Sequence, residues 1–156
     1  VALDAPLNHH MLPSDCLGLS PLALSVKFSW SAGWKALLRA GACLSSFEEQ
    51  TMLHMCVSTR HTRREAELQA MVQLLLEYKC EVNKRDARGC TALHLATRRG
   101  SQEILKLLLR HSAAVDTTDS LGQTALMIAA SEGHQGTIDT LISAACNVNQ
   151  ENSNGL

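Results

Sequence analysis

The chain has 156 residues, a formal net charge of −1 at pH 7 and a pI near 6.7, so neither total indicates a nucleic-acid or membrane-surface partner. Hydrophobic residues make up 46% of the chain but aromatic residues only 3%, which predicts a core built from aliphatic and small side chains. No apolar run is long enough to span a membrane, and no signal peptide is visible.

The cysteines form no C-x-x-C pair and show no cysteine–histidine spacing typical of a zinc site. We therefore expect no metal and no cofactor, and we interpret the thiols as small residues that are mostly buried. Reduced thiols favour an intracellular setting, cytoplasmic or nuclear or both. The cysteines are Cys16, Cys43, Cys56, Cys80, Cys90 and Cys146.

Residues 1–14 show no helical pattern and are interpreted as an irregular lead or the remnant of an earlier repeat. His9 and His10 form an isolated pair in this segment, so we expect no metal role for them. The chain begins at Val1 rather than at a methionine, which leaves open that it is a fragment of a larger protein.

An internal repeat follows this lead. The stretch Asp86–Ala96 aligns in register with Asp119–Ala129 and shares its aspartate, glycine, threonine, leucine and two alanines, and the same 33-residue offset continues through the glycines and leucines that come after. Two earlier copies are less regular. The predicted copies span 15–45, 46–85, 86–118 and 119–151, and residues 152–156 begin a further copy.

Each copy is predicted to form two short helices joined by a turn. Thr91 and Thr124 are good N-caps, because a hydroxyl can accept a hydrogen bond from a free amide of the first helical turn. Gly100 and Gly133 suit the helix end, where a left-handed residue is favoured. One helix pair cannot bury both of its sides, so stacked copies must complete the core. The expected packing residues include Leu93, Leu95, Ala96, Ile104, Leu105, Leu107, Leu108, Leu109, Ala129 and Ala130.

The segment Thr91-Ala92-Leu93-His94-Leu95-Ala96 resembles the ankyrin repeat signature T-P-L-H-x-A at every position but the proline. The resemblance implies an all-α solenoid of stacked helix-turn-helix layers with projecting β-turn or hairpin fingers. It also implies that His54 and His94 make structural hydrogen bonds rather than act in catalysis. The implied function is a non-catalytic protein–protein interaction module that binds through the concave face and the finger tips.

The 46–85 copy departs most from this pattern. Glu49 lies where the finger glycine belongs, so we expect an altered turn. The copy carries seven extra residues near Ser58 to Leu68, interpreted as an exposed loop or an extension between its two helices. A solvated loop without a role and a partner contact both stay open for this insertion. In the 15–45 copy, Trp34 is expected in the core, and Trp30 is either an exposed turn residue or a partner anchor.

Basic residues concentrate in one part of the chain, because nine of the 14 lysines and arginines fall between Arg60 and Arg99. By the family pattern some of them belong to a finger and others to a first helix, and together they are interpreted as one basic stripe. A solvated surface is one explanation, and a contact for an acidic segment of a protein partner is the other. The predicted partner-binding residues are Arg85, Arg88, Arg98, Arg99, Ser120, Leu121 and Gln123, and we expect the chain to be monomeric.

Leu75, Glu81, Val82 and Asn83 resemble the segment modified by the asparaginyl hydroxylase that acts on ankyrin repeats. This resemblance implies Asn83 as a hydroxylation target. The competing interpretation is that Asn83 is a structural residue that stabilises its turn.

No phosphate-binding loop, dinucleotide-binding glycine motif or nucleophile motif occurs, so we predict no catalytic residues and no enzymatic activity. A second hypothesis makes the chain the substrate-recruiting arm of a larger multidomain enzyme, such as a ubiquitin-ligase adaptor. Nucleic-acid binding is disfavoured, because an aromatic stacking platform is missing from the sequence.

Overall fold

The computed structural model describes residues 24–25, 31–40, 52–58, 65–153 and 155. Within these ranges the chain forms helices and turns and no strand, which confirms the all-α prediction. The helices are α2 (Ser31–Arg39), α3 (Met52–Ser58), α4 (Glu65–Glu77), α5 (Ala92–Arg99), α6 (Gln102–Arg110), α7 (Ala125–Glu132) and α8 (Gln135–Ser143).

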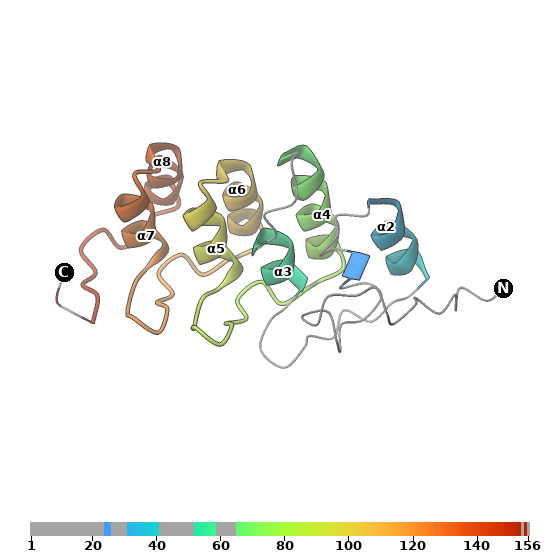
Figure 1. The fold of residues 1–156 in the computed structure, drawn as a ribbon. Coiled ribbons are helices and arrows are strands. Elements are labelled where there is room, and N and C mark those ends of the chain that lie inside the picture. Colours follow the sequence, from blue (N-terminus) through green and yellow to red (C-terminus); the bar gives the residue numbers. More distant parts are fainter. Residues whose placement is uncertain (1–23, 26–30, 41–51, 59–64, 154, 156) are drawn as a thin grey trace.

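The helices form two parallel rows, with α3, α5 and α7 in one row and α4, α6 and α8 in the other (Figure 1). Each helix pair packs internally and against the next pair: α5 contacts α3, α6 and α7, and α6 contacts α4 and α8. Loops between successive pairs project along one edge of the stack (Figure 1). The predicted serial layering is therefore confirmed.

The predicted helix ends have the expected backbone geometry in the two most regular copies, but the threonine cap bond forms only before α7. Thr91 precedes α5 without a hydroxyl cap bond, and its hydroxyl instead lies 2.9 Å from His94 Nδ1. Thr124 precedes α7, and its hydroxyl accepts a hydrogen bond from the Met127 amide at 3.3 Å. Gly100 and Gly133 end α5 and α7 with φ of 75° and 72°, the left-handed region in which a side chain is strained.

The core is aliphatic, as the composition predicts, and runs continuously through the layers. Leu93 and Ala96 contribute to it from α5 and are at most 1% exposed. The prediction was too broad at the edges of the helices, because Leu107 is only half-buried and Ala130 is exposed. Fully buried large side chains are Leu53, Leu68, Leu75, Leu93, Ile104, Leu105, Leu108, Leu141, His54 and His94.

Part of the 58–68 insertion is helical. Helix α4 has 13 residues where α6 and α8 have 9, and the additional turn lies at its start, from Glu65. Leu68 in this turn is completely buried, so the insertion lengthens the second helix and contributes to the core. Of the two interpretations given for the insertion, the exposed loop does not apply to residues 65–68, which belong to helix α4. Other sequence predictions concern residues outside the described part of the chain, namely Arg60, Arg63, Arg64, Glu49, Trp30, His9, His10 and the side chain of Trp34.

Candidate functional site

The projecting loops contain two tight hairpins of the same design, which we call the fingers Asp86–Cys90 and Asp119–Gln123. In the first finger the Asp86 amide donates to the Cys90 carbonyl at 2.8 Å, and the Gly89 amide donates to the Asp86 carbonyl at 2.8 Å. The Asp86 carboxylate accepts from the amides of Arg88 and Cys90 at 2.9 and 2.8 Å. This short aspartate side chain closes the hairpin locally, so the finger holds its shape without help from a partner.

The second finger repeats these contacts. The Asp119 carboxylate accepts from the amides of Leu121 and Gln123, both at 2.9 Å. The Asp119 amide in turn donates to the Gln123 carbonyl at 3.0 Å. Two unrelated tip sequences therefore share one backbone, because aspartate and glycine are kept at the two positions that define the turn.

Neighbouring fingers are joined backbone to backbone. The Ser120 amide donates to the Arg88 carbonyl at 3.0 Å, and one layer further along the Ser153 amide donates to the Leu121 carbonyl at 3.4 Å. A Cβ atom on Gly89 would lie 2.9 Å from the Ser120 nitrogen, and Gly89 has φ of 71°. Glycine is needed here both for the turn and for the close approach. The fingers thus form an ordered row.

His94 ties the first helix of one layer to the finger of the next. The Thr91 amide donates to His94 Nδ1 at 3.1 Å, so Nδ1 is unprotonated and Nε2–H donates to the Gln123 carbonyl at 3.2 Å. Burial lowers the pKa of His94, which keeps the ring neutral. His54 makes the equivalent contact from Nε2 to the Cys90 carbonyl at 2.9 Å. The predicted structural role of both histidines is confirmed.

Arg85 and Asn83 also make contacts to the next loop. Arg85 donates from Nε to the Gly89 carbonyl at 3.0 Å and from Nη2 to the Thr118 carbonyl at 2.6 Å. Asn83 donates to the Ser112 carbonyl at 3.1 Å and accepts from the Ala114 amide at 2.8 Å. Both side chains therefore have a structural use, which for Arg85 the sequence does not signal, because its acceptor lies 33 residues away.

The remaining predicted arginines are not all in one place. Arg88 is exposed at the finger tip, and its side chain makes no hydrogen bond or ion pair with the described residues. Arg98 is exposed on α5, and its charge acts on both Cys90 and His94, so its guanidinium extends back along the helix toward the finger. Arg99 is separate from these two.

Arg99 is the last residue of α5, at the end of the helix pair opposite the finger. Its guanidinium is 3.8 Å from the Glu65 carboxylate, and its side chain is 24% exposed. The two residues line a hollow of about 260 Å³ with Gly100, Ser101, Gln102 and Glu103. The structure therefore brings Arg88 and Arg98 toward one finger and places Arg99 elsewhere.

The predicted contacts of the second finger differ in exposure. Leu121 is 63% exposed, although it is apolar. Ser120 is exposed and Gln123 is half-buried, and the backbone of each contributes to the finger row through the bonds described above. Leu121 is consequently the most prominent apolar side chain of the fingers.

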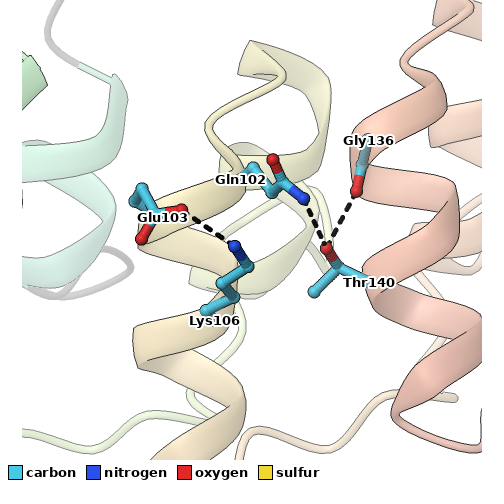
Figure 2. A network of polar contacts seen from close by, with 5 residues as sticks. All are labelled: Gln102, Glu103, Lys106, Gly136 and Thr140. Atoms are coloured by element: carbon cyan, nitrogen blue, oxygen red, sulfur yellow. Dashed lines mark hydrogen bonds and ion pairs between the residues drawn. The ribbon is translucent and has the colours of Figure 1, made fainter.

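The row formed by α4, α6 and α8, which we call the outer helices, carries polar side chains that bond to one another. Figure 2 shows Gln102 of α6 donating to the Thr140 hydroxyl of α8 at 3.2 Å, while Thr140 donates to the Gly136 carbonyl at 2.8 Å. Lys106 and Glu103 form an ion pair at 2.9 Å on the same helix α6. The polar groups of these four side chains are therefore bonded within the chain.

The described part of the chain was also searched for reactive thiols, metal-binding clusters and membrane-spanning helices. Burial raises the pKa of Cys56 to about 12 and that of Cys80 to about 11, so neither thiol is a ready nucleophile near pH 7. Burial also raises the pKa values of Cys90 and Cys146. Among the described residues no group of three or more histidine, cysteine or acidic side chains is placed to hold a metal ion. None of the described helices is long and apolar enough to cross a membrane.

Comparison with known families gives one match. A family model described as ankyrin repeats in three copies matches residues 64–152. The matched range contains both fingers, both of the regular predicted copies and helix α4. A search among curated proteins found no significant match.

Proposed function

Since the chain belongs to the ankyrin repeat family, we propose that it is a non-catalytic module that binds a protein partner through its finger tips and concave face. Ankyrin repeats are in general protein–protein interaction modules. The residues proposed to contact the partner are Arg85, Arg88, Arg98, Ser120, Leu121 and Gln123 on the finger side, and Arg99 as a separate contact at the far end of α5.

The observation that carries this proposal is the finger row itself. Two hairpins are closed by hydrogen bonds to their own aspartates and are joined through the bond from the Ser120 amide to the Arg88 carbonyl. Because hydrogen bonds already order these loops, a partner that binds them loses little free energy to ordering of the loop backbone. Rigid tips with outward side chains are a favourable surface for recognition.

The partner is proposed to carry an acidic segment. Arg88 is exposed and has no polar contact with the described residues, and Arg98 is exposed nearby on α5. Arg85 and Arg99 have contacts within the chain, so they assist such a partner less directly. Complementary charge mainly raises the association rate and the specificity of a complex. We further propose that the chain acts as a monomer.

A pull-down with the wild-type chain beside an Arg88→Glu/Arg98→Glu double variant tests this function. We expect the wild type to retain a protein partner in a salt-dependent manner and the double variant to retain less of it with a flatter salt dependence. Arg110→Glu, an exposed arginine on α6, is the matched control and should behave as the wild type. If the wild type retains no protein at all, the proposed function fails; equal retention by both chains rejects the acidic contact.

The alternative role as a substrate-recruiting arm of a larger enzyme stays a prediction. It would use the same surface, and it differs only in what happens to the partner after binding. Co-purification of ubiquitin-ligase subunits with the chain, together with ubiquitylation of the retained partner, would favour this role over a simple scaffold.

The proposed hydroxylation of Asn83 is independent of the partner. The side-chain amide of Asn83 is exposed but already bonded to Ser112 and Ala114, which supports the structural interpretation. Intact-mass and peptide-mass measurements of chain purified from cells test the modification, and an Asn83 peptide without an added oxygen would count against it.

A further inference from the structure

Arg88 and Leu121 occupy equivalent positions in neighbouring fingers. Each residue comes two positions after the finger aspartate and directly before its glycine. The bond from the Ser120 amide to the Arg88 carbonyl joins the two tips directly. A cationic residue and an apolar residue therefore occupy equivalent exposed positions on adjacent layers of one hydrogen-bonded row.

Single exposed leucines are common in proteins, so exposure alone does not mark Leu121 as a binding residue. Its backbone contacts add a second observation. Its amide donates to Asp119 at 2.9 Å, and its carbonyl accepts from Ser153 at 3.4 Å. Both backbone polar groups are thus bonded while the side chain remains 63% exposed. A partner that covers this side chain gains apolar burial without having to order the backbone beneath it.

The charge next to Leu121 is positive. Arg88 lies on one neighbouring finger, and Arg98 acts on Cys90 at the base of the same finger. The carboxylates of Asp86 and Asp119 each accept two backbone amides, so they are directed into their hairpins rather than toward a partner. An acidic side chain is therefore the complement of the Arg88 finger, and an apolar side chain is the complement of Leu121.

The distance between the two fingers limits the shape of such a partner. Packed helices lie about 8–10 Å apart, and that separation sets the step from one layer to the next. An extended chain advances about 3.3 Å per residue, so roughly three residues cover one step. An α-helix advances about 1.5 Å per residue and would need roughly two turns for the same step.

We propose that the partner binds as an extended segment that crosses the fingers and places an acidic side chain against Arg88 and an apolar side chain on Leu121, about three residues apart. This inference rests on the proposed function and adds the chemistry and the spacing of the bound segment. The neighbouring Arg98 supplies a second positive charge to the acidic side chain.

Selection of random displayed peptides on the wild-type chain tests the inference. We expect enriched peptides to share an acidic and an apolar residue about three positions apart, in either order. Their binding should weaken about tenfold with Arg88→Glu and about tenfold with Leu121→Ser, as expected for the loss of one good contact. Two matched controls, Arg110→Glu and Ile142→Ser, change exposed residues on the outer helices and should leave binding unchanged.

A charge swap separates direct contact from a loss of folding. Replacing the acidic residue of an enriched peptide by lysine should abolish binding to the wild type and restore binding to Arg88→Glu. Enriched peptides that lack the spacing, or that bind both finger variants as well as the wild type, overturn the inference and leave the proposed function intact. Selection that enriches no peptide also overturns it, whereas failure of the proposed function is seen separately, when the wild-type chain retains no protein in the pull-down.

Discussion

Two successive junctions of this stack have the same backbone register but different side-chain contacts. We define the first junction as the contact between residues 83–94 and residues 112–123, and the second as the contact between residues 116–127 and residues 145–153. At the first, Asn83, Arg85 and His94 all donate to backbone carbonyls of the next loop. At the second, Asp116 is the equivalent of Asn83 and accepts from the Asn147 amide at 2.8 Å. Among the described equivalents of these three residues, Asp116 alone bonds to the next loop.

The substitutions explain this difference. Thr118 replaces Arg85 and Met127 replaces His94, and neither makes the corresponding bond to the next layer within the described residues. Met127 accepts only from the Thr124 amide of its own layer, at 3.4 Å. The backbone bond between fingers nevertheless recurs at both junctions. Stacking register is thus set by the backbone and the apolar core, and the side-chain contacts add strength that varies from layer to layer.

Loss of the histidine contact should produce the largest effect. His94→Leu removes the interlayer bond to the Gln123 carbonyl and leaves the buried Thr91 amide without its acceptor, so we expect the free energy of unfolding to fall by about 2–3 kcal/mol. Met127→Leu changes the equivalent residue, which lacks the interlayer bond, and should cost less than about 1.5 kcal/mol. Urea unfolding followed by circular dichroism measures both values. Equal costs would mean that the interlayer bond contributes nothing.

The two helix-ending glycines offer a second matched pair. Alanine at either position adopts a left-handed conformation that costs about 1–2 kcal/mol. A Cβ atom on Gly100 would also lie 3.0 Å from the His134 ring of the next layer, whereas one on Gly133 would meet nothing within 4 Å. Displacing His134 also breaks its 3.2 Å bond to the Arg98 carbonyl. We therefore expect Gly100→Ala to cost about 1 kcal/mol more than Gly133→Ala in thermal or urea unfolding.

Acid should weaken the first junction through His94. Burial lowers the pKa of this ring in the folded chain, so the unfolded chain binds more protons just below the ordinary histidine pKa. The stabilising contribution is complete above that ordinary value, near 6.5, and is lost as pH falls toward the lower folded value. The slope is at most about 1.4 kcal/mol per pH unit for one proton. Unfolding of the wild type and His94→Leu from pH 7 to 5 isolates this slope as their difference, and parallel curves would contradict it.

A substitution at Asn83 should have the smallest effect on the free energy of unfolding. Asn83→Asp gives the first junction the residue that the second junction has at the equivalent position. Asn83→Asp keeps the acceptor for the Ala114 amide but loses the donor to Ser112, as in Asp116. We expect a cost of about 0.5–1 kcal/mol, and about 1–1.5 kcal/mol for Asn83→Ala, which loses both bonds. Urea unfolding ranks the two variants. If Asn83→Asp were the more costly, the amide donor would be the dominant contact.

Local signals predicted the repeating framework well. The 33-residue offset, the threonine caps and the helix-ending glycines all act within a few residues, so their effect can be read without knowledge of neighbours. The histidine role was also predictable, but only because the family signature carries it. The start of α4 was not, since an insertion can add a loop or a helical turn, and burial of Leu68 against the core favours the turn.

The sequence predicted less well which basic side chains are available to a partner. Arg85 and Arg88 have the same charge and lie three residues apart, yet Arg85 is bonded to the next loop and Arg88 has no such contact among the described residues. Arg98 and Arg99 are adjacent in sequence but extend toward opposite ends of the layer, because Arg98 leans toward Cys90 and Arg99 toward Glu65. Sequence identifies these residues as basic and does not decide which of them is available to a partner.

The amino-acid sequence alone determined the helical layers, their period and the polarity of their faces, because those properties depend on interactions between residues close in the chain. Only the tertiary structure decided which polar side chains are used between layers and which face outward. Those contacts join loops 29–36 residues apart, and whether a donor reaches its acceptor depends on a separation that the stacking of the layers sets.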